Sequence, residues 1–410
     1  MYDLEKIRKQ FPMLDPNKKM QGHKLVFLDN ASTTFKPQCV LDAINEYYTE
    51  CTANSHRGDY DLMYLVDKRV RDTRKVVAEF VNSDVDEVVF TAGDTMSLNT
   101  VAFGYGLKFL TKGDVILTSE GEHASNLLPW FRVSQMTGAE IRYIPLDEDG
   151  CVTISNLKKV LDQNVKVVTL AHVGNVMGYD IDVKAIAKLC HEVGAIFVVD
   201  GAQSVPHMKT DFKGWDIDFL CFSAHKMCGP TGIGCLIGKK ELLQKMDPFL
   251  LGGGMNETFT KPNNMVTFDA PAKFEGGTQN LAGIFGLKAA IEFLMSIGME
   301  NIHQYELELK KYVIEKLQGV DNVIIYNAKA RNGILTFNVK DRFSQDESTY
   351  LNYKGIAIRS GQHCDKLLNC YLGTPATCRA SFYLYTTKEE IDYLVENLIN
   401  GGDILDAYFN

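Results

Sequence analysis

The stretch Ile196-Phe197-Val198-Val199-Asp200-Gly201-Ala202-Gln203 decides the predicted fold. Four apolar residues run directly into an acid, a pattern typical of a buried strand that ends at a polar site. Further short apolar runs occur at residues 88–90, 115–117, 167–170, 219–222 and 233–237. Segments with helical periodicity alternate with these runs, at about 61–81, 95–109, 126–137 and 182–192. This alternation predicts an α/β fold with a mainly parallel sheet covered by helices.

The pattern of predicted elements changes after residue 280. From there, the expected elements are helices at 281–297, 301–317 and 388–400 and strands near 334–337 and 356–358. This grouping predicts a smaller α+β domain at the C-terminal end. We therefore expect an N-terminal segment of residues 1–20 packed on the small domain, a large domain of residues 21–280 and a small domain of residues 281–410.

Length and composition exclude several classes of protein. The chain has 410 residues, 45% of them hydrophobic, so it can bury a large core. Its net charge of −9 argues against nucleic acid or a membrane surface as a main partner. The charged N-terminus is unlike a secretory signal, and no apolar run approaches the roughly 20 residues that span a bilayer. The 10 cysteines form no Cys-x-x-Cys pair, so we expect a cytoplasmic protein with neither disulfides nor a metal site.

Polar side chains that follow the apolar runs are the candidates for chemistry, because ligands bind at the carboxyl ends of parallel strands. Lys226 ends the sequence Ser223-Ala224-His225-Lys226, which follows the run at 219–222. Burial there would lower the pKa of the amine and make it a nucleophile for an aldehyde. Ser223 and His225 can hold an anion beside it, and Asp200 offers a carboxylate for a cationic partner.

These groups together are what pyridoxal phosphate requires: a lysine for its aldehyde, an acid for its ring nitrogen and a cradle for its phosphate. The sequence Thr91-Ala92-Gly93-Asp94-Thr95-Met96-Ser97 would complete the cradle, because it follows a predicted strand and opens a helix. His123 can provide a ring that stacks on the cofactor. A single strand-end Asp or His is more often structural, so the prediction depends on the combination.

Nearly the whole chain resembles a known family, the class V aminotransferase-like, pyridoxal-phosphate-dependent cysteine desulfurases, and most closely its SufS-like second group. The lysine motif at 223–226 and the cysteine motif at 359–364 are the specific ones. Other matching segments are residues 6–12, 28–34, 55–58, 175–178, 199–203 and 378–385. The sequence departs from the family's usual residues at Gln362, Met96 and Asp59-Tyr60.

The resemblance implies roles around the cofactor. Lys226 would bond to its aldehyde, Asp200 would pair with its ring nitrogen, Gln203 would bond its phenolic oxygen and His123 would stack on its ring. The residues implied at the phosphate are Asp94, Thr95, Ser223 and His225, joined by Thr278 from the neighbouring subunit of a homodimer. The residues implied at the substrate carboxylate are Arg379 and Asn175, with Arg359 close by.

Cys364 decides the implied reaction. It lies in a polar, glycine-containing loop, unlike Cys221 and Cys235, which interrupt apolar strands. Its thiolate would attack the sulfur of L-cysteine, giving L-alanine and a persulfide on Cys364. The persulfide sulfur would pass to an acceptor protein in iron–sulfur cluster assembly or other sulfur metabolism. The adjacent His363 is expected to be a solvated loop histidine.

The sequence leaves alternatives open. A selenocysteine lyase acting on L-selenocysteine, an epimerase or an aminotransferase would use the same cofactor. A nicotinamide dehydrogenase has little support, because no Gly-x-Gly-x-x-Gly follows a strand. A non-catalytic partner in sulfur or iron–sulfur assembly is disfavoured because both Lys226 and Cys364 are present.

Overall fold

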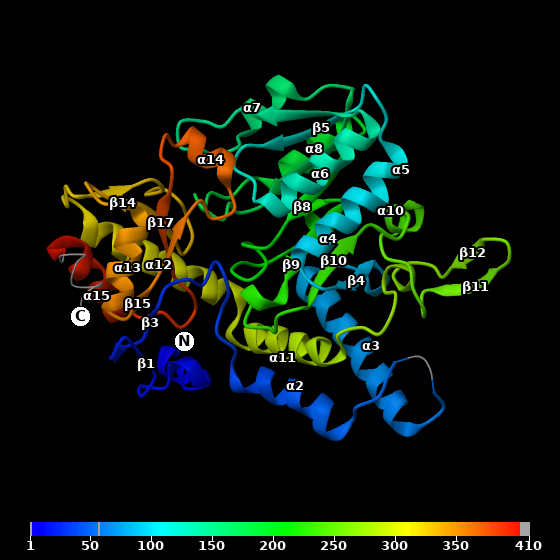
Figure 1. Ribbon diagram of the computed structural model, residues 1–410, viewed down its shortest axis with the longest axis horizontal. Coiled ribbons are helices and arrows are strands. Elements are labelled where there is room, and N and C mark those ends of the chain that lie inside the picture. Colours follow the sequence, from blue (N-terminus) through cyan, green and yellow to red (C-terminus); the bar gives the residue numbers. More distant parts are fainter. Residues whose placement is uncertain (1, 56–57, 402–410) are drawn as a thin grey trace.

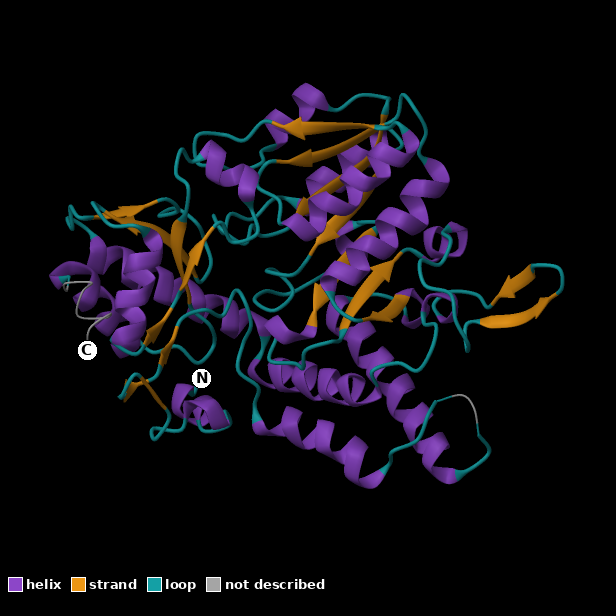
Figure 2. Cartoon of the chain, viewed as in Figure 1, coloured by secondary structure: helices purple, strands orange, loops and turns teal. Residues whose placement is uncertain are grey.

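The computed structural model describes residues 2–55 and 58–401 (Figure 1). His56 and Arg57, which belong to one of the family-like segments, lie outside the described residues. The chain forms a large sheet with helices on both faces and a smaller sheet beside it, as Figure 2 shows by secondary structure. The cavity described below lies where these two parts meet.

The large sheet has seven strands and confirms the predicted, mainly parallel architecture. In spatial order its strands are β4 (Val88–Thr91), β10 (Gly234–Gly238), β9 (Phe219–Ser223), β8 (Ile196–Asp200), β7 (Val165–Ala171), β5 (Val115–Ser119) and β6 (Glu140–Ile144). Strand β10 runs antiparallel to both of its neighbours, and the remaining pairings are parallel. The carboxyl ends of the parallel strands therefore meet at one edge of the sheet.

Helices bury both faces of this sheet. One face is covered by α3 (Asp61–Val81), α8 (Val183–Glu192) and α11 (Leu281–Ile297), and the other by α4 (Asp94–Val101), α6 (Ala124–Thr137) and α10 (Lys240–Lys245). Along β8, Phe197 and Val199 belong to the first layer and Val198 belongs to the second. Because both faces are buried, the strands are continuous apolar runs, which made them visible in the sequence.

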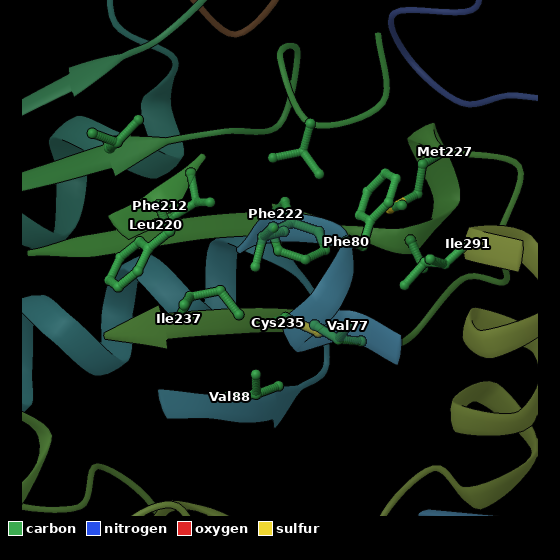
Figure 3. Packing of buried hydrophobic residues seen from close by; sticks show 14 of the residues in the cluster. Val77, Phe80, Val88, Phe212, Leu220, Phe222, Met227, Cys235, Ile237 and Ile291 are labelled. Atoms are coloured by element: carbon green, nitrogen blue, oxygen red, sulfur yellow. The ribbon is translucent and has the colours of Figure 1, made fainter. Parts of the chain in front are cut away.

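The layer beneath α3 shows how this packing is built (Figure 3). Val77 and Phe80 of α3 share one buried cluster with Phe222 of β9 and Cys235 of β10, and Ile291 of α11 belongs to the same cluster. The cluster therefore fixes β9 and β10 beneath the helices, and the residues that follow β9 are held at a defined position.

The smaller sheet is antiparallel and has its own core. In spatial order its strands are β13 (Val323–Ile325), β14 (Ile334–Val339), β17 (Thr377–Ser381) and β16 (Arg359–Gly361). The helices α12 (Met299–Leu317), α13 (Ser344–Tyr353) and α15 (Lys388–Asn400) contribute to that core. Beside this sheet, β3 (Val26–Phe27) pairs in parallel with β15 (Ile356–Ala357), so the chain that follows the N-terminal segment reaches both parts.

The N-terminal segment contacts the helices of the smaller sheet. Arg8, the last residue of α1 (Leu4–Arg8), forms an ion pair with Glu390 of α15 at 2.9 Å. The ring of Tyr2 stacks on Tyr305 of α12 with 4.4 Å between ring centroids. The domain limits at residues 20 and 280 remain predictions, and α11, which follows the second limit, packs against α2 (Gln38–Glu50) and α3.

Several elements were not predicted from the sequence. They include α2, β6, α10, β13, α13, β16, β17, α7 (Ile154–Val160), α14 (Lys366–Tyr371) and the hairpin of β11 (Asn256–Thr260) and β12 (Asn264–Thr267). The predicted helix at 95–109 is divided into α4, a π turn at Ala102–Gly106 and α5 (Leu107–Phe109). The helices at 61–81, 281–297 and 388–400 have the predicted limits.

No single helix among the described residues is both long enough and apolar enough to cross a membrane. The helices α11 and α12 have the length and composition of a membrane span only when they are taken together, and the pair is bent by 72°.

Candidate active site

A cavity of about 190 Å³ lies at the carboxyl edge of the large sheet, and residues of β16 and β17 line its other side. The residues predicted for the site line this cavity, with Thr278 as the exception. They are Asp94, Thr95, His123, Asn175, Asp200, Gln203, Ser223, His225, Lys226, Arg359, Cys364 and Arg379. The fold thus brings together side chains that are up to 285 positions apart, from Asp94 to Arg379.

Lys226 lies in the short turn Ala224–Lys226 that follows β9. Within the described chain, no hydrogen bond or ion pair engages its Nζ atom. Burial lowers the pKa of Lys226, and the nearby carboxylates of Asp200 and Asp94 oppose this shift only in part. An amine that is free and less basic than usual can act as a nucleophile and as a proton acceptor.

Asp200 is the last residue of β8 and is buried. Its Oδ1 accepts a hydrogen bond from the backbone N–H of Ala202 at 2.9 Å. Burial raises the pKa of Asp200, and burial together with the charge of Asp200 raises the pKa of Asp94 well above its usual range. A cationic group in the cavity would stabilise the ionised form of both carboxyl groups, because a nearby opposite charge favours the charged form.

The first turn of α4 can hold an anion. The helix begins after Gly93, whose φ of 146° few other residues adopt, and an added Cβ there would lie 3.2 Å from Ser223 Oγ. The backbone N–H of Asp94 donates to Ser223 Oγ at 2.7 Å, and Thr95 Oγ1 lies 2.8 Å from Ser125 Oγ. Hydroxyls beside a helix N-terminus are groups that bind phosphate.

His123 and His225 both line the cavity as neutral rings. His123 caps the N-terminus of α6, and its Nδ1 accepts a hydrogen bond from the backbone N–H of Ser125 at 3.2 Å. Burial, reinforced by the positive charge of Lys226, lowers the pKa of each histidine to about 4. At neutral pH, His123 therefore offers an uncharged ring for stacking and His225 an uncharged N–H donor.

Unpartnered polar atoms mark the cavity as a ligand site. Among the buried atoms without a hydrogen-bond partner in the described residues are Asp94 Oδ1, Gln203 Oε1 and Arg379 Nε. The Nε2 atom of Gln203 donates to the backbone oxygen of Ala31 at 2.8 Å, which fixes the amide. Since a buried polar atom without a partner is costly, the convergence of such atoms on one cavity indicates a polar ligand.

Arg379 and Arg359 supply the positive charge of the opposite wall. Arg379 is buried, and its Nη1 donates to the backbone oxygen of Asn175 at 2.9 Å. Burial lowers the pKa of Arg379 to about 10, so the guanidinium stays charged at neutral pH. Planar guanidinium groups match a carboxylate through two parallel hydrogen bonds, which makes this wall suited to an acid.

Cys364 lies at the rim of the cavity and is exposed. Its backbone and that of His363 are left-handed, with φ values of 59° and 52°, an uncommon conformation for residues other than glycine. The carbonyl of Cys364 accepts from the N–H of Ala124 at 2.8 Å, and Asn175 Nδ2 donates to the carbonyl of His363 at 3.0 Å. The thiol is thus held where it can meet both a molecule in the cavity and one outside it.

The expectation that His363 is a solvated loop histidine is wrong. Its side chain is buried, and its Nε2 lies 3.0 Å from both the backbone oxygen and Oγ1 of Thr377. The contact ties the Cys364 loop to β17, a strand that the sequence did not suggest. The pairing partner of a loop residue is set by the tertiary structure, so the sequence could not show it.

We expect His363 to make the protein sensitive to acid. Burial lowers its pKa to about 3, against about 6.5 in an unfolded chain. Between those values only the unfolded state binds the proton, so the free energy of unfolding falls as the pH drops through 6.5. Urea unfolding of wild type and His363→Gln should differ in pH dependence: between about pH 7 and pH 4.5 the wild type should lose about 2 to 3 kcal/mol more. If the free energy of unfolding changed equally with pH in both proteins, His363 would not be held neutral in the folded state.

Thr278 lies apart from the predicted site. It lines a second cavity of about 50 Å³ together with Asn54, Ser55 and Gly277. The fold of a single chain therefore does not bring Thr278 to Lys226.

Ser32 and Ser125 line the main cavity and were not predicted as site residues. Ser125 lies two residues after His123, a position that offered a sequence signal because it falls in the first turn of the following helix. Ser32 lies in a turn that follows β3, and its contacts with Arg359 and Arg379 join residues more than 300 positions apart. Nothing local in the sequence indicates those contacts.

The chain matches the family described as Aminotransferase class-V over residues 26–394. A probable cysteine desulfurase of Halalkalibacterium halodurans is 43% identical over 393 residues, which cover 96% of each chain. The crystal structure of the cysteine desulfurase CsdA from Escherichia coli has a TM-score of 0.90 and 34% identity, and the alignment covers 99% of both chains. The apo structure of a cysteine desulfurase from Thermococcus onnurineus NA1 has a TM-score of 0.91 and 35% identity, covering 97% of this chain and 98% of that one. The chain therefore belongs to the class-V aminotransferase family and, within it, to the cysteine desulfurases.

Proposed function

We propose that the protein is a pyridoxal-phosphate-dependent cysteine desulfurase that converts L-cysteine to L-alanine and collects the sulfur as a persulfide on Cys364. The observation that carries the proposal is the content of one cavity: the free amine of Lys226, the buried carboxyls of Asp200 and Asp94, and the exposed thiol of Cys364 at its rim. Family membership agrees with this chemistry.

The cavity residues fit the cofactor. Lys226 would bond to its aldehyde, Asp200 would face its ring nitrogen, and His123 would stack on its ring. Its phosphate would meet the first turn of α4 with Thr95, Ser223 and His225, and Gln203 would bond its phenolic oxygen through the amide N–H that Ala31 leaves free. When bound, the cofactor supplies an electron sink for bonds broken at the substrate's Cα and Cβ atoms.

The chain's own residues position the substrate and move its protons. The guanidinium of Arg379 receives the substrate carboxylate and fixes the direction of the Cα–H bond. Lys226, whose pKa is lowered by burial, is the base that takes the Cα proton and the acid that returns one. The carboxylate of Asp200 stabilises a positive charge on a group bound next to it, since a carboxylate in a low-dielectric cavity favours the charged form of such a group.

Sulfur transfer takes place at Cys364. Its thiolate attacks the substrate's sulfur, so a new S–S bond forms and the Cβ–S bond breaks. The electron pair of the broken bond remains on the carbon side, which is reduced and takes up a proton to become alanine. The sulfur of Cys364 is oxidised to the persulfide, and no external oxidant is required because the two changes balance.

We further propose that the persulfide passes to a sulfur-acceptor protein. The exposure of Cys364 supports this, because a thiol buried in the cavity could not meet a macromolecule. A SufS-like position in iron–sulfur cluster assembly and a cytoplasmic location belong to the same proposal.

We propose a homodimer in which Thr278 completes the active site of the neighbouring subunit. Thr278 lines a different cavity from Lys226, which supports this arrangement, as does the hairpin β11–β12, which extends away from the large sheet in Figure 1. Large apolar side chains are exposed on and near this hairpin, namely Leu250, Leu251, Phe259, Met265 and Val266. Apolar side chains gathered in this way are typical of a subunit interface.

Mixed dimers test the shared site. Thr278→Ala alone should reduce turnover strongly, because it removes a phosphate ligand. When Lys226→Ala and Thr278→Ala subunits are mixed in equal amounts and allowed to exchange, one site of each mixed dimer is intact, so about a quarter of wild-type activity should return. Absence of recovery in mixed dimers that have been isolated would place Thr278 outside the shared site.

The proposed activity is tested by incubating the holoenzyme with L-cysteine and a reductant and by measuring alanine and sulfide together. Both should appear in equal amounts. Release of pyruvate and ammonia in place of alanine would contradict the desulfurase reaction.

A further inference from the structure

We propose that the hydroxyl of Ser32 positions the two arginines that receive the substrate carboxylate and thereby sets the affinity for amino-acid substrates. The inference deepens the proposed function and rests on it. Ser32 is a positioning residue in this proposal, because it acts through Arg359 and Arg379.

The two arginines occupy directly opposed positions on neighbouring strands of the smaller sheet. In the antiparallel pairing of β16 with β17, Arg359 is the register partner of Arg379. Side chains at such opposed positions begin about 5 Å apart, and like charges placed there repel each other. The pair therefore needs groups that hold the guanidiniums in place when no carboxylate is bound.

Ser32 contacts both guanidiniums at once. Its Oγ accepts from Arg379 Nη2 at 2.8 Å and from Arg359 Nη1 at 3.1 Å. The same hydroxyl donates to Oδ1 of Asp29 at 2.7 Å, and Asp29 also forms an ion pair with Arg379 Nη2 at 3.3 Å. A hydroxyl has one proton to donate and two lone pairs to accept, so Ser32 uses its full hydrogen-bonding capacity in this cluster.

The backbone around Ser32 is fixed to the same sheet. The N–H of Ser32 donates to the carbonyl of Asp29 at 3.2 Å, which closes a turn. Asp29 forms a bridge with Ser381 of β17, and the N–H of Ala31 donates to Ser381 Oγ at 2.9 Å. The hydroxyl of Ser32 is thus held relative to Arg379, which lies two residues before Ser381 on β17.

This arrangement leaves two N–H groups of Arg379 for a ligand. One N–H of Nη1 donates to the carbonyl of Asn175 and Nη2 is engaged by Ser32 and Asp29, whereas the second N–H of Nη1 and that of Nε have no partner among the described residues. Because Ser32 and Asp29 hold the guanidinium, it is already oriented when the carboxylate arrives. Preorganised donors bind more tightly because less freedom is lost on binding.

Ser32→Ala tests this role in the holoenzyme. We expect KM for L-cysteine and the dissociation constant for L-alanine, measured by calorimetry, to rise together by roughly tenfold, the effect of losing a hydrogen bond to a charged group. The value of kcat should stay within about twofold, because the loss affects ground state and transition state alike. Ser32→Thr, which keeps the hydroxyl, should restore both constants.

Ser344→Ala is the matched control, because it removes another buried serine hydroxyl, in α13, which contacts Gln345 and neither arginine. It should lower the melting temperature and leave KM close to the wild-type value. In the double variant Ser32→Ala/Arg379→Ala, KM should exceed that of Arg379→Ala alone by much less than tenfold, since the guanidinium that Ser32 holds at 2.8 Å is then absent.

Several results would overturn the role of Ser32. One is an unchanged or lower KM in Ser32→Ala, and another is a lower melting temperature as the only effect of that change. A third is a KM of the double variant that is raised by the full product of the two single effects. Failure of the proposed function would look different, because wild type itself would then release no alanine from L-cysteine, and L-alanine binding would still report on Ser32.

Discussion

Cys364→Ser is expected to lower alanine release from L-cysteine by at least about 10³-fold, because a serine oxygen cannot accept the substrate's sulfur to form a persulfide. Serine keeps nearly the same size and the same backbone contacts, including the bond from Ala124 to the carbonyl of residue 364. Substrate binding should therefore persist. Alanine is measured by chromatography, and the tryptic peptide that contains position 364 is examined for an added sulfur atom.

Cys370 provides the matched control. It is also exposed and lies in α14, six positions after Cys364, but it does not line the cavity. Cys370→Ser should retain wild-type turnover. Undiminished alanine release by Cys364→Ser would contradict the mechanism and favour a lyase or an aminotransferase. Cleavage of L-selenocysteine at equal rates by wild type and Cys364→Ser, with little turnover of L-cysteine by either, would indicate a selenocysteine lyase.

Lys226→Ala is expected to lower turnover by at least about 10³-fold, because the variant lacks both the covalent anchor of the cofactor and the group that moves the Cα proton. The fold should survive, since the Nζ atom makes no hydrogen bond to other described residues. After borohydride reduction of the wild type, peptide mass spectrometry should find the cofactor on Lys226, and the variant should retain none.

Lys36 is the alternative attachment site against which the assignment of Lys226 is tested. Burial lowers its pKa to about 8, so it is another lysine near the site with an amine that is less basic than usual. Its Nζ donates to Thr33 Oγ1 at 3.3 Å and to the carbonyl of His225 at 3.1 Å, which leaves it engaged. Cofactor found on Lys36 in the reduced wild type would remove Lys226 from its role and would require a different site.

The core of the fold was predictable because its strands are buried on both faces. The run at 196–199 is apolar at every position, and β8 contributes alternate side chains to the two helical layers. Lys226 and Asp200 were predictable for the same reason, since each follows such a strand at the edge where ligands bind.

The opposite wall of the site was predicted only through the family resemblance. Strand β17 is fully buried, yet it reads Thr-Cys-Arg-Ala-Ser and carries a buried arginine, so no apolar run reveals it. Arg379 is stable there because Asn175, Ser32 and Asp29, from distant parts of the chain, hold its guanidinium. Contacts of this range depend on the assembled fold, which also explains why His363 was expected at the surface.

The most direct measurement is a single turnover of the holoenzyme with substoichiometric L-cysteine, in the absence of reductant and acceptor. Alanine and the persulfide on the peptide containing Cys364 should form at the same rate and in equal amounts, because the same step breaks the Cβ–S bond and forms the S–S bond. Alanine formed without sulfur on Cys364, or sulfur found first on another cysteine, would contradict the proposed mechanism.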